Sequence, residues 1–145
     1  MDMTQEDKNL LVRDICARLP YGVIAHASEI NKNGIITDVN ILYSMVNLTV
    51  DNASGKYEPV PLSDIKPYLR PLSSITEEER NEYFDVKMQE CERVALAEVY
   101  RPEAISIIMD WLNSRHLDYR GLIEKGLALE APERMYKKLY NHDNN

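Results

Sequence analysis

Apolar residues recur every three or four positions in three stretches of the chain, a spacing that predicts three helices. In the first stretch Leu11, Ile15 and Leu19 share one face, and Thr4 with Asp7 forms a variant of the capping box that begins a helix. The Pro-Tyr-Gly sequence directly after Leu19 ends this helix, because proline and glycine both interrupt helical backbone.

The second helix has a clear beginning at Thr76, which forms a capping box with Glu79. A stripe at helical spacing then runs along it: Phe84, Met88, Cys91, Ala95 and Val99. Stripes of this kind usually pack into a protein core, so we predict that this face is buried.

The third helix begins at Pro102, since proline is favoured in a first helical turn. One face carries Ile105, Ile108, Met109 and Leu112, while Ile107 and Trp111 lie off that face. A helix that is apolar over so much of its circumference is predicted to be buried on two sides. It is therefore either the central helix of the fold or a helix whose second face meets another subunit.

Residues 21–62 have the alternating pattern of strands instead. Residues 22–30 are β-prone, and Asn31–Gly34 is a turn signal. The next stretch places five residues on one side of a strand: Ile35, Thr37, Val39, Ile41 and Tyr43. We expect the chain to bend at residues 43–45 and to return as a second strand.

In that second strand Val46, Leu48 and Val50 alternate with polar residues. Asn52–Gly55 is another turn signal, and the strand that follows it at residues 56–62 contains prolines, which suit an edge position. Three or four short antiparallel strands of this kind predict a curled sheet or a small SH3-like barrel.

Two segments are irregular. In the first, Ser63 begins a short helical turn and Pro67 and Pro71 keep the connection to the second helix extended. The tail beyond Leu117 is divided into short pieces by three residues, Gly121, Gly126 and Pro132.

These elements predict an α+β fold with an N-terminal helix, a small antiparallel sheet or SH3-like partial barrel, two long C-terminal helices and a folded-back tail. We interpret residues 1–145 as a single domain. Within it, residues 1–72 form a helix plus a small β unit, and residues 73–145 form a helical unit that shares the core.

Composition agrees with a globular protein, since 44% of the residues are hydrophobic and 28% are charged. The chain has no apolar run of the roughly 18–20 residues that cross a bilayer. The acidic N-terminus does not resemble a secretory signal, so we expect a cytoplasmic location.

Cys16 and Cys91 lie within helical patterns and are interpreted as buried thiols, with a disulfide as the alternative.

The net charge of −7 is concentrated in residues 73–100, which contain eight acidic and three basic residues and so carry a net charge of −5. Phosphate backbones would be repelled by this surface, and no basic stripe compensates elsewhere. Direct nucleic-acid binding is therefore disfavoured. A basic protein partner is permitted, although a charge run is most often a solvated face.

No strong catalytic motif stands out. The histidines, His26, His116 and His142, have no metal-ligand spacing to one another or to a cysteine. The nucleophile-elbow, phosphate-loop and dinucleotide-binding patterns are lacking too. We therefore predict a protein that is not an enzyme, with no cofactor and no metal site.

One cluster near the end of the third helix has candidate chemistry. Its proposed ligand-binding residues are Arg115, His116, Tyr119 and Arg120. The two arginines could grip a small anion such as a phosphate or carboxylate by paired hydrogen bonds.

A structural interpretation of the same cluster is favoured. Basic residues in a last helical turn interact favourably with the helix dipole, and Asp118 could cap a following short helix that ends at Gly126. The tail would then dock on the body through Tyr119, Leu122, Ile123, Leu127 and Leu129.

Four phrases of the sequence, RDICARLPYGV, DIKPYLRPLSSITEEE, DWLNSRHLDYRGLIEKGLALEAPE and MYK, resemble a family of short uncharacterised proteins. The family occurs in gut bacteria of the Bacteroides group and in their phages and mobile elements, and residues 24–60 correspond to its variable part. Arg134 departs from the family, which has glycine there in APEGMY, and this departure puts a tight turn in question. The resemblance implies a cytoplasmic protein of a phage or mobile element, and it supplies no functional residues.

Our first functional hypothesis is a non-enzymatic protein-interaction or accessory module of a phage or mobile element, directed at the host, for example as an antagonist of host defence. Its β part would meet the protein partner, and the third helix would support self-association. The alternative is a protein that binds or sequesters a small phosphorylated nucleotide at Arg115, His116, Tyr119 and Arg120.

Overall fold

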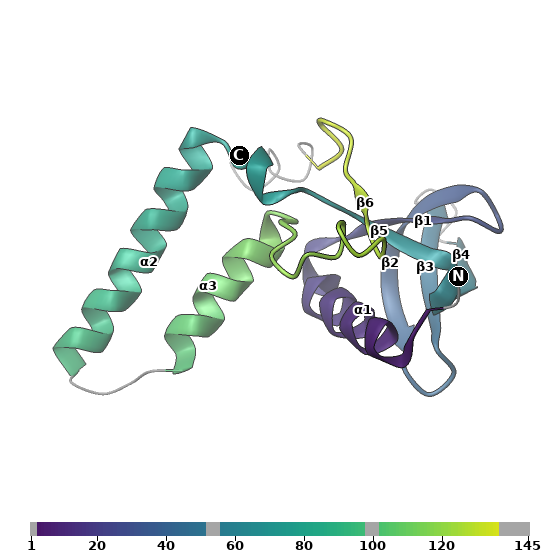
Figure 1. The fold of residues 1–145 in the computed structure, drawn as a ribbon, viewed down its shortest axis with the longest axis horizontal. Coiled ribbons are helices and arrows are strands. Elements are labelled where there is room, and N and C mark those ends of the chain that lie inside the picture. Colours follow the sequence, from purple (N-terminus) through teal and green to yellow (C-terminus); the bar gives the residue numbers. More distant parts are fainter. Residues whose placement is uncertain (1–2, 52–55, 98–101, 137–145) are drawn as a thin grey trace.

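The computed structural model describes residues 3–51, 56–97 and 102–136, and it has the α+β fold that the pattern predicts (Figure 1). The helices are α1 (Gln5–Arg18), α2 (Glu77–Ala97) and α3 (Pro102–Ser114), with short 3-10 turns at Leu19–Tyr21, Leu62–Asp64 and Leu72–Ser74. The strands are β1 (Ile24–Ala27), β2 (Lys32–Asn40), β3 (Met45–Asp51), β4 (Lys56–Pro61), β5 (Ile65–Leu69) and β6 (Leu129–Glu130).

The strands form an open six-stranded sheet in the order β4-β3-β2-β1-β5-β6. All neighbours are antiparallel except β5 and β6, which are parallel. The expectation of an SH3-like partial barrel is therefore wrong. Closure would require β4 to bond to β6, but β4 carries Pro59 and Pro61, which have no N–H to donate, and β6 has only two residues. The proline-containing strand lies at the sheet edge, as predicted.

The β2–β3 hairpin differs in detail from the prediction. Strand β2 ends at Asn40, and its first half buries Gly34 and Ile36 and not the odd-numbered residues. A bulge between Ile36 and Asp38 then shifts the register, and beyond it the odd-numbered Val39 packs against the core. Ile41 and Tyr43, expected on the strand, lie in an exposed turn. The bend expected at residues 43–45 overlaps this turn.

The turn before β2 spans residues 28–31, with Asn31 in the left-handed region at φ 48°. The turn expected at Asn31–Gly34 is thus misplaced, since residues 32–34 belong to β2. Gly34 has a packing reason to be glycine, because a Cβ there would lie 2.9 Å from the carbonyl oxygen of Thr49.

Strand β5 was not predicted. Pro67 and Pro71 suggested an extended connection, but residues 65–69 pair with β1, and the buried Pro67 lies opposite Ala25. The short helical turn expected at Ser63 is present just before this strand. Proline is compatible with the strand where its missing N–H is not needed by the ladder.

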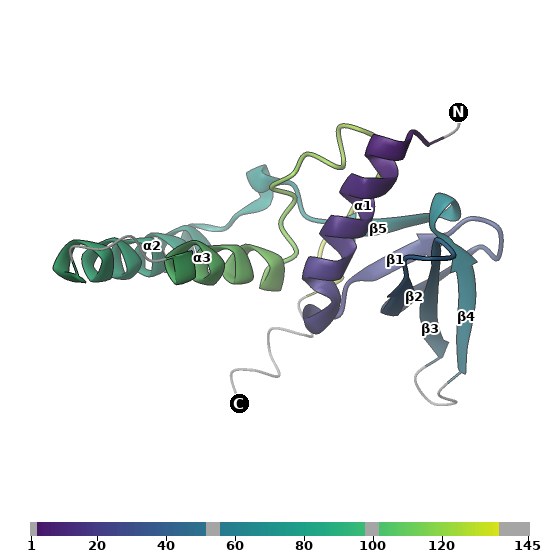
Figure 2. The same ribbon diagram turned by 90° about the horizontal axis from the view of Figure 1, so that it is seen from below.

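Helix α1 crosses one face of the sheet and encloses the core with it (Figure 2). Its capping box of Thr4 and Asp7 is confirmed, and Leu11 and Ile15 are fully buried. Val46 and Leu48 of β3 point to the same core, as their alternation predicts. The prediction of a buried thiol at Cys16 is wrong, because Cys16 lies on the exposed side of α1.

Helices α2 and α3 form an antiparallel hairpin that projects away from the sheet (Figures 1 and 2). The capping box of Thr76 and Glu79 is confirmed by bonds in both directions. The predicted burial of the α2 stripe is wrong for Phe84 and Met88, which are exposed. Cys91, Ala95 and Val99 lie outside the side chains that the structure describes, as does the turn signal at residues 52–55.

Helix α3 begins at Pro102, as predicted, but it is not buried on two sides within one chain. Ile105 and Ile107 are exposed, whereas Trp111 and Asn113 near the end of the helix are buried, and Trp111 contacts Tyr83 at a ring-centroid distance of 5.3 Å. Across residues 3–51, 56–97 and 102–136, no helix is both long and apolar enough to span a bilayer.

The tail folds back onto the body, as expected, but residues 122–126 form turns and not a short helix. Gly121 and Gly126 both have positive φ, which interrupts helical backbone. A tight turn also occurs at Arg134, despite the arginine: its φ is 75°, and Met135 N–H donates to the carbonyl of Pro132 at 3.1 Å.

Candidate functional site

The four predicted ligand-binding residues lie together beyond the end of α3 but are directed to different partners. Arg115 donates from Nη2 to Glu82 Oε1 of α2 at 2.6 Å, and its guanidinium lies 5.8 Å from the centroid of the Trp111 ring. Tyr119 donates from its hydroxyl to Asn113 Oδ1 at 2.8 Å. These contacts fix the base of the α2–α3 hairpin.

Arg120 points in another direction, to helix α1. Its Nη1 donates to Asp14 Oδ1 at 2.9 Å. Asp14 is also the partner of Arg18 one turn later, with Arg18 Nε and Nη2 at 2.8 and 3.0 Å from its two carboxylate oxygens. Asp14 and Arg18 are both fully buried, and Arg18 also donates to the carbonyl of Leu117 at 2.7 Å.

The ring of Tyr119 lies against both of these arginines. The guanidinium of Arg18 is 5.2 Å from the ring centroid, and that of Arg120 is 4.8 Å from it. Cation–π contacts of this kind are strongest where water is excluded. Asp14, Arg18, Tyr119 and Arg120 therefore form one partly buried ionic cluster, which ties the first helix to the tail.

His116 occupies the other side of the same junction. It is buried, its backbone is left-handed at φ 60°, and its ring stacks on Tyr136 at 3.6 Å with an interplanar angle of 9°. Burial lowers the pKa of His116 to about 3, helped by the nearby positive charges of Arg18, Arg70 and Arg115. A neutral imidazole stacked inside the fold is a structural element.

The sequence predicts that Asp118 caps a short helix, but residues 122–126 form turns, so its carboxylate holds these turns instead. Its carboxylate accepts from the backbone N–H groups of Leu122 and Ile123 at 2.9 and 3.0 Å. Leu122 and Leu127 are buried in the main core, so the predicted docking of the tail is confirmed. Most of the polar groups in this segment are thus used to hold the chain's own elements together.

Sequence reasoning missed Asp14 and Arg18 as the centre of this cluster. The signal was present, because Leu11, Asp14, Ile15 and Arg18 follow the spacing of one helical face. An acidic and a basic residue on a buried face four positions apart predict a buried ion pair. Their distant partner, Arg120, has no local signal.

A cleft of about 790 Å³ opens between the start of α2 and the tail. Its charged lining residues are Arg70, Glu78, Glu79, Glu82, Arg115, Glu130, Glu133 and Arg134. Of the four predicted ligand-binding residues, only Arg115 lines this cleft.

The arginines at the base of the cleft contact glutamates. Arg70 binds Glu79 with two hydrogen bonds, at 2.6 and 2.8 Å. Burial tends to raise the pKa of Glu79, but hydrogen bonds from Arg70 and Thr76 and the charge of Arg70 outweigh it and lower the pKa. Among the described residues, no group of three or more His, Cys, Asp or Glu side chains could hold a metal ion.

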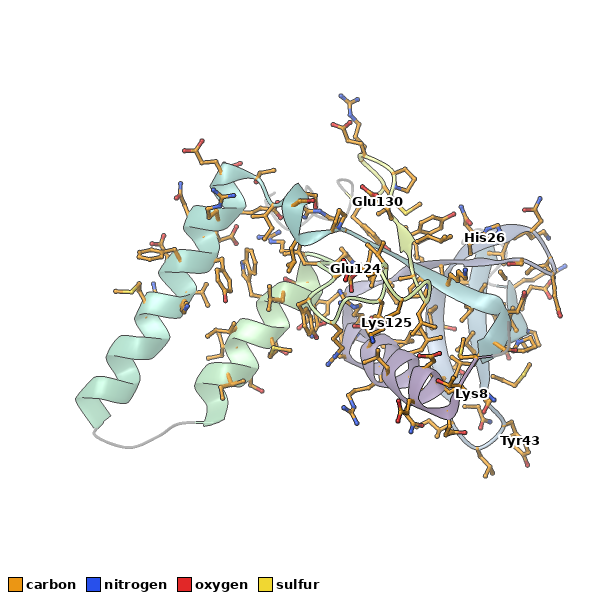
Figure 3. All side chains as sticks on the ribbon, viewed as in Figure 1. Lys8, His26, Tyr43, Glu124, Lys125 and Glu130 are labelled. Atoms are coloured by element: carbon orange, nitrogen blue, oxygen red, sulfur yellow. The ribbon has the colours of Figure 1, made fainter. Side chains whose placement is uncertain are left out.

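Two exposed apolar surfaces are the other candidate sites. The first is the tip loop, which we define as Ile41–Tyr43 in the turn between β2 and β3. Figure 3 shows the Tyr43 side chain directed away from the body at this turn. The second is the hairpin face, which carries Phe84 and Met88 of α2 and Ile105 of α3.

The fold and these surfaces define an α+β protein with an open sheet and a projecting helical hairpin. Comparison with protein-family models, with curated proteins and with solved structures finds no match.

Proposed function

We propose that this protein is a non-enzymatic interaction module that binds another protein through the tip loop. The observation that carries the proposal is the exposure of three consecutive apolar side chains, 67% at Ile41, 82% at Leu42 and 71% at Tyr43. Single exposed apolar residues are common, but a contiguous group marks interaction sites.

The tip loop is held in one conformation by its own hydrogen bonds. Tyr43 N–H donates to Asn40 Oδ1 at 3.1 Å, and Ser44 N–H donates to the carbonyl of Ile41 at 3.4 Å. Ser44 in turn accepts from Leu62 N–H at 2.8 Å, which joins the loop to the start of the next 3-10 turn. Since the loop is already ordered, binding would lose little conformational entropy.

The chemistry of the partner follows from the charge around the loop. Residues 39–50 contain no Asp, Glu, Lys, Arg or His in a chain that is 28% charged. We therefore expect the loop to insert into an uncharged, apolar pocket of a protein. Nucleic acids and anionic membranes are poor partners for a chain of net charge −7.

The biological setting that fits this proposal is the one implied by the sequence resemblance: an accessory module of a phage or mobile element, directed at a host protein. A loop of small area can bind tightly when a few apolar or aromatic residues fill a pocket.

Site-specific photocrosslinking tests the proposal. A photoreactive phenylalanine analogue at Tyr43 should crosslink a specific host protein, and the same analogue at Tyr57, which is 63% exposed on β4, is the matched control. With the captured protein purified, the Leu42→Ser/Tyr43→Ser variant should bind at least about 30-fold more weakly, and Tyr57→Ser should bind normally. Equal binding by all three proteins would refute the role of the loop.

A second candidate, binding of a small anion such as a phosphorylated nucleotide, is supported by the cleft that Arg70 and Arg115 line. A phosphate would have to displace Glu79 or Glu82 from these arginines, which makes the candidate weaker. A thermal-shift screen with nucleotides tests it, because a ligand at a hundredfold excess over its Kd stabilises by about 2.7 kcal/mol. A shift that persists in Arg115→Ala would exclude this site.

A further inference from the structure

The hairpin face is an apolar surface that is exposed to solvent in a single chain. Phe84 is 60% exposed, Met88 47% and Ile105 51%, although they lie in regular helices and not in loops. The buried core is made by α1, the sheet and the tail, and none of its described members belongs to α2 or α3. No described part of the body therefore covers these side chains.

Helical geometry places the exposed residues of both helices on the same side of the hairpin. Each residue turns a helix by about 100°, so Phe84 and Met88 lie about 100° and 140° past Tyr83, which faces α3. Ile105 lies about 120° past Trp111, which faces α2. Because α2 and α3 run in opposite directions, a rotation of similar size and sign from the line of contact leads to the same side of the two-helix layer on both helices. Phe84, Met88 and Ile105 therefore lie on one side of the hairpin.

Figure 2 shows the hairpin edge-on as a single layer of two helices, clear of the described part of the body. Two helices in one layer can bury the line where they touch but not a whole face. The stable arrangement for such apolar faces is a second layer of helices, as in a four-helix bundle.

We propose that the second layer is the hairpin of another copy of this chain, so that the protein is a dimer held by an antiparallel four-helix bundle. The two-fold axis would lie in the interface, perpendicular to the helices, with each α2 against the partner's α2. A two-fold interface brings the same patch of both copies together. Phe84 and Met88 suit this arrangement because they flank residue 87, the midpoint of α2.

Charge selects the antiparallel orientation. Glu77, Glu78 and Glu79 lie in the first turn of α2. A parallel pairing would bring these carboxylates close to their counterparts in the partner. In the antiparallel bundle the two acidic ends are separated by the length of α2, about 31 Å, which is several Debye lengths at physiological salt.

The available area fits a dimer of moderate strength. Helix α2 has 21 residues and α3 has 13, so two helices about 10 Å apart offer a flat face on the order of 500 Å². A standard interface buries about 800 Å² on each partner. We therefore expect a dimer that dissociates on dilution.

Analytical ultracentrifugation over a range of concentrations tests the dimer. The chain has a mass of 16.8 kDa, and the weight-average mass should rise towards twice that value with concentration. Phe84→Glu/Ile105→Glu, and separately Met88→Glu, should remain monomeric with unchanged circular dichroism. Gln89→Glu, an exposed substitution on the opposite side of α2, should leave the dimer intact. A wild-type protein that is monomeric at every concentration would overturn the proposal.

Crosslinking tests the orientation. In a variant with Cys16 and Cys91 replaced by serine, a short bis-maleimide should join two chains through Met88→Cys but not through Glu77→Cys. Crosslinking at position 77 would refute the antiparallel bundle.

This proposal does not depend on the tip loop, which lies on the sheet and away from the hairpin (Figure 1). The two proposals are separated by their variants. The Leu42→Ser/Tyr43→Ser variant should still form dimers, and the Phe84→Glu/Ile105→Glu variant should still bind the partner protein.

Discussion

Mild acid should destabilise this protein chiefly through one buried residue, His116. In the folded chain the pKa of His116 is lowered to about 3, first by burial and then by the charges of Arg18, Arg70 and Arg115. Between that value and the ordinary value of 6.5, the unfolded chain takes up a proton that the folded chain excludes. Stability is therefore fully present above pH 6.5 and falls as the pH drops below it.

The magnitude follows from the size of this window. Each pH unit below 6.5 costs about 1.36 kcal/mol for one proton, so at pH 5 the loss from His116 is about 2 kcal/mol. That is a large part of the stability of an ordinary small domain. Glu79 contributes little in this range, because its pKa is lowered from 4.5 and its stabilising ionised form is lost only at lower pH.

Urea denaturation at pH 7.5 and pH 5.0, followed by the fluorescence of Trp111, measures the effect. His116→Asn is the matched variant, because asparagine is neutral and tolerates the left-handed backbone at φ 60°. The wild type should lose about 2 kcal/mol between the two pH values and the variant much less. Equal losses in both proteins would refute the assignment of this pH dependence to His116.

Three further predictions concern single positions. Asp14→Asn removes the carboxylate between two arginines and should lower the free energy of unfolding, measured by urea denaturation, by about 3–5 kcal/mol. Replacing the buried pair together (Asp14→Leu/Arg18→Met) should lower it much less. A mild effect of Asp14→Asn would contradict the ionic cluster. Arg134→Gly should raise the free energy of unfolding by about 1 kcal/mol because φ is 75°, while Arg134→Ala, which retains the strain, should give no gain. Gly34→Ala should cost about 1–3 kcal/mol, since its Cβ would meet the Thr49 carbonyl oxygen at 2.9 Å; an unchanged denaturation midpoint would show that the strand yields freely.

Two ion pairs lie at the base of the α2–α3 hairpin. Arg70 with Glu79, and Arg115 with Glu82, join the start of α2 to β5 and to the end of α3. Both pairs lie at the cleft and are partly exposed, so their individual contributions are small. The Arg70–Glu79 pair ties the start of α2 to the residue after β5, whereas the Arg115–Glu82 pair joins α2 to the end of α3 within the hairpin.

Local signals in the sequence determined much of the fold. The capping boxes at Thr4 and Thr76 and the start of α3 at Pro102 were all predicted from residues close together in the sequence. Such features depend on hydrogen bonds between near neighbours, and therefore the sequence alone identifies them. The alternation in β3 was predictable for a similar reason.

Other features were decided only by the tertiary structure. Strand β5 exists because residues 65–69 meet β1, a pairing that was concealed by Pro67 within the strand and Pro71 just after it. Arg120 is directed to Asp14, 106 positions away, so the cluster that looked like an anion site from its local sequence is joined to the first helix.

The helical stripe with Phe84 and Met88 shows the same limit most clearly. Its spacing correctly indicated one apolar face of a helix, but periodicity does not say what covers that face. Within one chain the face is exposed, because the hairpin projects from the body instead of packing on it. Burial depends on which distant segments, or which other chains, come together, and that information is not contained in the spacing of residues along one helix.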